Sequence, residues 1–153
     1  MKFLVCVDGS EHSQKALEMA AKIGMGCNVE EVLIIYVYDN MSDIYLSFLG
    51  DEGGSVTEEQ MENMRKAMEM AKKDKKKILS KASEFFKKKG IISRTIFKEG
   101  HPSHTIINVA HEEKVDMIVI GSRGLSGLKK VFLGSVSNAV VQEVKDCSVL
   151  VVK

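Results

Sequence analysis

The stretch that decides the fold is MIVIGSRGLSGLKKVFLGSVSNAVVQEV, which runs from Met117 to Val144. It begins with four consecutive apolar residues, 117–120, and such a run predicts a strand that is buried on both faces. It ends in residues 136–144, whose pattern of apolar positions predicts a helix. A long loop rich in glycine and serine joins the two. The order is therefore strand, loop, helix.

The composition of this loop predicts a phosphate-binding cradle. Glycine allows the backbone to approach a ligand closely and to adopt positive φ angles. The start of the following helix presents free N–H groups and the positive end of the helix dipole, and both attract anions. Ser135 and Ser137 add hydroxyl donors at that helix start. A simple connection from strand to helix is the alternative, but a long ordered loop inside a compact domain is usually functional.

Two common phosphate-binding motifs are absent from the sequence. No GxxxxGK[ST] string occurs, so the loop lacks the lysine that reaches the β- and γ-phosphates in a Walker A loop. No GxGxxG string occurs either. The cradle is therefore of another type.

The rest of the chain alternates between strand and helix patterns. Strands are predicted over 3–7, 32–37, 91–97, 117–120 and 147–152, and helices over 10–24, 57–89, 102–113 and 134–144. Residues 39–56 are predicted to form a loop or a partly helical excursion. Alternating βα units predict one doubly wound α/β domain, over residues 1–153, around a parallel sheet. Such sheets bind ligands beyond the carboxyl ends of their strands, where Asp8, Val37 and Gly121 lie.

Composition narrows the possible functions. The chain has 153 residues, of which 44% are hydrophobic and 28% charged, and its net charge is +1. It has no electrostatic attraction to nucleic acid or to a membrane surface, and no apolar run reaches the ~18 residues that span a bilayer. Three separated cysteines without a CxxC pair argue against a disulfide framework. We therefore expect a cytoplasmic protein without nucleic-acid or membrane partners.

The long helix predicted over 57–89 carries an apolar stripe and a basic half. Its stripe consists of Met61, Met64, Met68, Ala71, Ile78, Leu79, Ala82, Phe85 and Phe86. We interpret the stripe as the face that packs on the core, with a methionine-rich partner groove as the alternative. The lysines of residues 72–89 are interpreted as a solvated face rather than as a nucleic-acid patch, because several glutamates balance them.

The spacing of the loop glycines resembles the nucleotide-binding signature of the universal stress protein family. That spacing is Gly121, two residues, Gly124, nine residues, then Gly134 and Ser135. The resemblance extends to the Val-Asp-Gly-Ser turn at 7–10, to Glu-Gly-His-Pro at 99–102 and to the closing strand at 147–152, and so covers essentially the whole chain. It implies a five-stranded parallel sheet in the order 3-2-1-4-5 with helices on both faces, an adenine nucleotide α-hydrolase-like fold.

The phosphate-cradle interpretation and the resemblance together indicate a set of nucleotide-binding residues. They are Asp8, Val37, Gly121, Arg123, Gly124, Gly134, Ser135, Val136 and Ser137. Asp8 would lie near the nucleoside, although the residues alone allow it equally to cap the next helix. The main chain of Val37 would pair with the adenine edge. Arg123 would contact phosphate, with a solvated loop charge as the equal alternative.

These features predict a nucleotide-dependent switch or sensor of the stress response that binds ATP, or alternatively AMP or ADP. Mg²⁺ would arrive with ATP, held mainly by phosphates and water, because no Cys/His metal pattern is present. A slow ATPase, a dimeric scaffold with a vestigial site and a flavin site remain as alternatives. No catalytic residue is predicted. The resemblance implies a homodimer through the last strand, Val149–Val152, whose apolar edge needs to be covered.

Overall fold

Strands and helices alternate along the chain as predicted, with their ends displaced by a residue or two. The computed structural model describes residues 1–27, 29–39, 57–125 and 133–153. Its elements are β1 (Lys2–Cys6), α1 (Glu11–Gly26), β2 (Glu31–Tyr38), α3 (Glu58–Lys88), β3 (Ser93–Glu99), α4 (Pro102–Glu112), β4 (Met117–Gly121), α5 (Ser135–Glu143) and β5 (Ser148–Val152). Of the excursion predicted over 39–56, residues 40–56 lie outside the described residues.

The strands form one parallel sheet in the order β3-β2-β1-β4-β5, which confirms the topology that the resemblance implies. β1 lies at the centre, between β2 and β4. The chain first builds outward from β1 to β3 and then crosses back to β4 and β5. The order therefore reverses beside β1, and a doubly wound sheet opens a ligand crevice at such a point.

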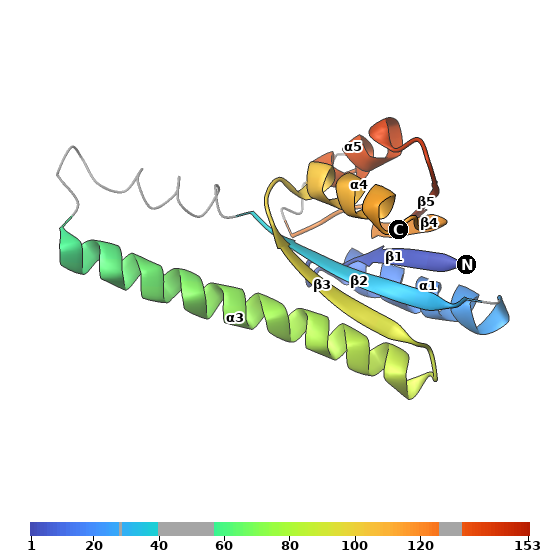
Figure 1. The fold of residues 1–153 in the computed structure, drawn as a ribbon, viewed down its shortest axis with the longest axis horizontal. Coiled ribbons are helices and arrows are strands. Elements are labelled where there is room, and N and C mark those ends of the chain that lie inside the picture. The colour runs from blue at the N-terminus through green and yellow to red at the C-terminus, as the bar shows by residue number, and fades with distance from the viewer. Residues whose placement is uncertain (28, 40–56, 126–132) are drawn as a thin grey trace.

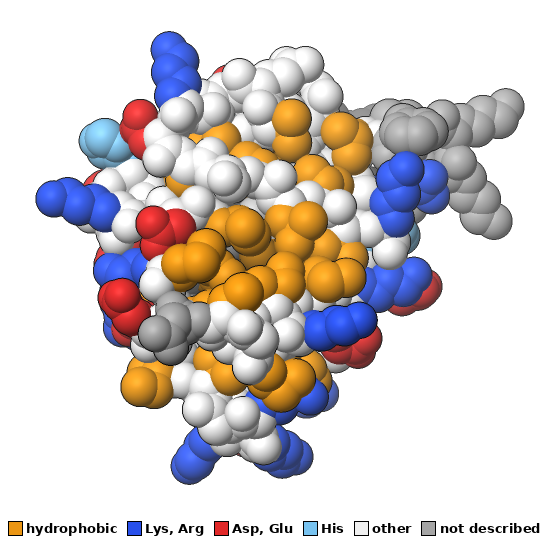
Figure 2. Space-filling model, turned by 90° about the vertical axis from the view of Figure 1, so that its right-hand side faces the viewer, with side chains coloured by type: hydrophobic (Ala, Val, Ile, Leu, Met, Phe, Trp, Pro, Cys, Tyr) orange, Lys and Arg blue, Asp and Glu red, His pale blue; other side chains and the backbone are white. Residues whose placement is uncertain are grey.

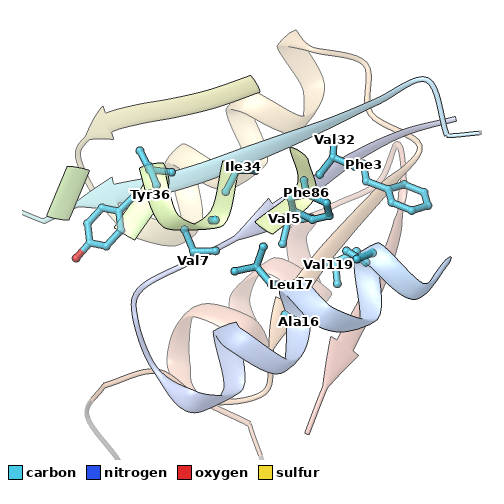
Figure 3. Packing of buried hydrophobic residues seen from close by; sticks show 14 of the residues in the cluster. Phe3, Val5, Val7, Ala16, Leu17, Val32, Ile34, Tyr36, Phe86 and Val119 are labelled. Carbon is cyan, nitrogen blue, oxygen red and sulfur yellow. The ribbon is translucent and has the colours of Figure 1, made fainter. Parts of the chain in front are cut away.

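Helices cover both faces of the sheet, α1 and α3 on one side and α4 and α5 on the other (Figure 1). Successive residues of β1 point to opposite faces, so Phe3 and Val5 pack in the cluster under α1 and α3, and Leu4 and Cys6 in the cluster under α4 and α5. Figure 3 shows the first cluster, in which Phe86 of α3 lies beside Val5. Burial on both faces explains the uninterrupted apolar runs of the central strands.

Capping residues close the starts of three helices. Ser10 caps α1, because its Oγ accepts a hydrogen bond from the Ser13 backbone N–H at 3.2 Å. Thr57 and Gln60 form a reciprocal capping box at the start of α3. Pro102 occupies the first turn of α4, where its missing N–H has no cost.

The prediction that the whole apolar stripe of α3 packs on the core is wrong for the first half of the helix. Leu79, Ala82 and Phe86 are buried, but Met61 is 51% exposed. The cause is length: 31 helical residues extend about 46 Å, whereas the eight residues of β2 extend only about 26 Å. Figure 1 shows α3 running past the ends of β2 and β3. Despite this length α3 is polar, and no helix of the described ranges has the length and apolar character that crossing a membrane requires.

Candidate nucleotide site

A cavity of about 220 Å³ lies at the carboxyl ends of β1, β2 and β4, beside the starts of α4 and α5. All nine residues predicted from the sequence line it: Asp8, Val37, Gly121, Arg123, Gly124, Gly134, Ser135, Val136 and Ser137. Parallel strands point their carboxyl ends to the same edge of the sheet. The fold thereby brings residues from both ends of the chain to one wall.

Asp8 orders the β1–α1 turn and also faces the cavity. Its Oδ1 accepts a hydrogen bond from the Ser10 backbone N–H at 2.8 Å. Its Oδ2 lies beside Gly124, 2.7 Å from the position that a Cβ atom on this glycine would occupy. Ser10 caps α1, so Asp8 is not the helix cap. A carboxylate accepts several hydrogen bonds, and Asp8 therefore retains acceptor capacity toward hydroxyl or amino hydrogens in the cavity.

The start of α5 presents backbone donors to the cavity. The Gly134 N–H donates to the Ser122 carbonyl at 2.8 Å, and the Ser137 hydroxyl lies 3.1 Å from the same oxygen. These bonds hold the start of α5 against the end of β4. Gly134 caps α5 without a side-chain hydrogen bond, and residues 135–137 line the cavity. The first-turn N–H groups of a helix have no partner within that helix, so this wall suits an anion.

Among the described residues that line the cavity, Arg123 carries the cationic side chain. Its side-chain Nε is buried and has no hydrogen-bond partner among the described residues. Its backbone carbonyl lies 3.5 Å from the Ser10 hydroxyl, so the residue spans from the β4 loop to the start of α1. Burying an N–H without a partner costs free energy that an acceptor would recover. This placement disagrees with a fully solvated loop charge and favours a role toward an anionic ligand.

Val37 lines the cavity with its main chain. The Ile35 carbonyl accepts from the Val7 N–H at 2.9 Å, toward β1, and the Tyr38 carbonyl accepts from the Gly100 N–H at 3.0 Å, toward β3. Backbone groups alternate sides along a strand, so those of Val37 face the β1 side. Because β1 ends at Cys6, they lie at the cavity rather than in the sheet ladder. An adenine edge could pair there.

Sequence reasoning missed the apolar wall of the cavity. That wall includes Cys6, Ile35, Pro102, Ile106 and Ile120. The strand residues among them could have been identified from the sequence, because they lie near the carboxyl ends of predicted parallel strands. Burial raises the pKa of the Cys6 thiol, and the Asp8 carboxylate raises it further, so this thiol is an inert part of the wall. An apolar slot next to polar groups suits a planar base attached to a polar tail.

Comparison of the whole sequence with known protein families identifies the family of this chain. A profile of the universal stress protein family matches residues 1–153. The chain belongs to the universal stress protein family. One relative, universal stress protein YxiE of Bacillus subtilis, is 39% identical over 152 residues, which are 99% of this chain and 98% of that protein.

Solved universal stress protein structures share the fold. The structure of MJ0577, a universal stress protein of Methanocaldococcus jannaschii, has a TM-score of 0.75 and 28% identity, covering 99% of this chain and 94% of that one. A universal stress protein structure in complex with cAMP has a TM-score of 0.64 and 25% identity, covering 99% of this chain and 95% of that one. This chain therefore shares its doubly wound fold with these two proteins.

Proposed function

We propose that this universal stress protein binds an adenine nucleotide, ATP or its products ADP and AMP, in the 220 Å³ cavity. The observation that carries the proposal is the convergence of all nine residues of the predicted site on this one cavity. A relative of the same fold whose structure contains cAMP supports the choice of ligand class.

The cavity offers a complementary group for each part of such a ligand. The apolar slot between Ile35, Ile106 and Ile120 suits the faces of the base, and the main chain of Val37 suits its edge. The carboxylate of Asp8 would accept from ribose hydroxyls or from the adenine amino group. The α5 start and Arg123 would hold the phosphates. Mg²⁺ would be bound by phosphate oxygens and water, since the described residues contain no cluster of three metal-binding side chains.

The biological role we propose is a cytoplasmic stress-response switch or sensor. Cys6, Cys27 and Cys147 are free thiols, which is typical of a reducing compartment. A bound nucleotide would bridge the β1–α1 turn, the end of β4 and the start of α5. A ligand that binds the folded state in this way stabilises it by mass action. A partner could therefore distinguish the loaded protein from the empty one.

The experiment that tests binding begins with the nucleotide released when the purified protein is denatured. ATP, ADP and AMP are then titrated into the nucleotide-free protein by calorimetry. We expect binding that Gly134→Val abolishes, because the valine side chain would fill the cradle. Gly134 adopts φ −67°, which any residue can adopt, so the backbone tolerates the change. Gly26→Val is the control, since an added Cβ at Gly26 meets nothing within 4 Å.

Failure of the intact protein to bind any of the three nucleotides would overturn the proposal. Equal loss of binding in Gly134→Val and Gly26→Val would remove its structural basis, because Gly26 lies at the far end of α1. If ATP binds, chromatography of samples taken over time measures the ADP formed and decides whether the protein also hydrolyses ATP.

We also propose that the protein is a homodimer through β5. This strand lies at the edge of the sheet and pairs with β4. Val149, Leu150 and Val151 are only half-buried. Figure 2 shows apolar side chains gathered on the face that is at the right in Figure 1, where the chain termini and β5 lie. An apolar edge strand of this kind favours pairing with another strand.

A further inference from the structure

The first half of α3 is a helical arm that extends beyond the domain. We define the α3 arm as residues 58–71. In Figure 1 it passes the ends of β2 and β3. Lys72, the next residue, pairs with Glu99 of β3 at 2.7 Å and lies over the Tyr38 ring of β2. The body of the domain therefore supports α3 from about Lys72 onward.

The apolar stripe of α3 continues along the arm without a break in spacing. Residues 61, 64, 68, 71, 75, 78, 82 and 85 follow one another at alternating steps of three and four, the spacing of a helix–helix seam. Apart from Lys75, every position of this seam is apolar. The sheet covers its second part, where Ala82 is buried. On the arm, Met61 is 51% exposed and Met64 and Met68 are half-buried.

Local interactions keep the arm helical without support from the core. The Thr57–Gln60 capping box closes its first turn, and Glu58 and Glu59 complement the helix dipole there. Arg65 pairs with Glu62 and with Glu69, each at 3.0 Å. A helical segment of this length is marginal in water without such contributions. The arm is thus a pre-formed helix that presents an apolar seam.

The charges of α3 are segregated in a self-complementary way. The arm carries four glutamates against Arg65 and Lys66, whereas residues 72–89 carry nine lysines against Asp74 and Glu84. Two copies of the helix in antiparallel orientation bring the acidic start of each toward Lys72 and Lys73, where the basic part of the other begins. Parallel copies would instead align like charges, which is unfavourable.

We propose that the α3 arm is an interface between two copies of this chain, packed antiparallel along the methionine seam. With Met64 opposite the partner's Met68, Met61 lies opposite the partner's Ala71. The pairing covers the methionines of the seam. This interface involves neither the nucleotide cavity nor β5, so a test of it does not depend on nucleotide binding or on a β5 dimer.

Disulfide trapping tests the register. In a background of Cys27→Ser and Cys147→Ser, Met64→Cys and Met68→Cys proteins are mixed in equal amounts and gently oxidised. We expect a covalent dimer linked between positions 64 and 68, identified by mass spectrometry. Lys66→Cys is the matched control, because residue 66 lies on the opposite side of the arm and is exposed. Circular dichroism checks that each variant is folded.

Either of two outcomes would overturn the proposal. One is no more covalent dimer from the mixture than from the Lys66→Cys control. The other is a predominance of 64–64 and 68–68 links, which parallel arms would give. If the cysteine at 64 resists alkylation but forms no link between chains, the same chain covers the seam, and the proposal is equally wrong.

A charge substitution gives a second readout. Met64→Glu combined with Met68→Glu should halve the assembly mass measured by sedimentation. The two substitutions place four carboxylates at the seam between two chains and none in the core of the domain. Nucleotide binding should not change. An unchanged mass of a variant that circular dichroism shows to be folded would contradict the arm interface.

Discussion

Gly121 and Gly134, at the two ends of the loop signature, meet different surroundings. A Cβ atom on Gly121 would lie 2.7 Å from the backbone carbonyl carbon of His12. One on Gly134 would lie 3.5 Å from the nearest atom, the Cα of Arg123, which is an ordinary contact. Gly121 is therefore required by the packing of β4 against α1. The fold itself does not require glycine at 134, so the space in front of that residue is available to a ligand.

We expect Gly121→Ala to destabilise the protein by about 1–3 kcal/mol, because backbone of α1 must move to admit the methyl group. Gly134→Ala should change the free energy of unfolding by less than about 0.5 kcal/mol. Urea unfolding of the two variants, followed by circular dichroism, measures both values. Equal stability of the two variants would show that the close approach at His12 relaxes without cost.

Arg123 offers a prediction about ligand discrimination. Arg123→Met should weaken ATP binding about tenfold, which corresponds to 1.4 kcal/mol, and should leave adenosine binding nearly unchanged, because only the phosphates require the guanidinium. Calorimetry with both ligands measures the difference. Arg65→Met, on the exposed arm, is the matched control. Equal weakening for ATP and adenosine would mean that Arg123 shapes the loop rather than binding phosphate.

At the scale of the elements, one charge network ties together the amino-terminal ends of the strands. Arg94 of β3 pairs with Glu113, the C-cap residue of α4, at 2.7 Å and with Glu31 of β2 at 3.4 Å. Lys2 of β1 lies 3.8 Å from Glu113 and donates to its backbone carbonyl at 3.0 Å. The hydrogen bond from Arg94 holds the pKa of the Glu113 carboxyl below its usual value. This network lies opposite the cavity and so concerns stability rather than binding.

The direction of that pKa shift predicts a pH dependence. The unfolded chain takes up a proton at Glu113 near its ordinary pKa of about 4.3, whereas the folded protein holds the carboxylate to a lower pH. The stabilisation is therefore present above about pH 4.3 and is lost as the pH falls through the lowered folded pKa. It amounts to less than about 1 kcal/mol, because solvent screens the pair.

Arg94→Met should reduce the loss of stability between about pH 5 and 3. Urea unfolding at a series of pH values gives the slope for the variant and for the parent protein. Arg65→Met, which removes exposed ion pairs with Glu62 and Glu69 on the arm, is the comparison. A variant slope equal to that of the parent would show that Arg94 does not stabilise the ionised Glu113.

At the scale of the whole molecule, the edge strand β5 determines how the proposed dimer can be tested. The Ser148 N–H donates to the Asp116 carbonyl, and the Val152 carbonyl accepts from the Ser122 N–H, so both residues face β4. Because backbone groups alternate, those of Leu150 also face β4, whereas those of Val149 and Val151 face away from the sheet. The outward groups of two β5 strands would pair in the dimer.

We expect Val151→Pro to convert a β5 dimer to a folded species of half the mass, because proline removes an outward N–H that the domain does not use. Leu150→Pro is the matched control and should unfold the domain, since it removes a hydrogen bond to β4. Light scattering and circular dichroism distinguish the two results. An unchanged mass for folded Val151→Pro would exclude pairing through β5.

Much of this fold could be predicted because its determinants are local. The caps at Ser10 and Thr57 and the buried strand at 117–120 all follow from residue types at short spacing. The strand order came from the family resemblance, which the structure confirms. The failed prediction, a core-facing stripe along all of α3, arose because periodicity reports an apolar face and not what lies against it.

The sequence by itself determined the sequence of strands and helices, the helix caps and the glycine-rich anion cradle, because each depends on neighbours within a few residues. Only the tertiary structure decided which groups meet. It placed Asp8 beside Gly124, left the Nε of Arg123 buried without a partner in the described chain, and closed the apolar wall with Ile35, Ile106 and Ile120. It also left the α3 arm beyond the sheet. These outcomes depend on strand order and on the lengths of packed elements, and no local pattern in the chain encodes them.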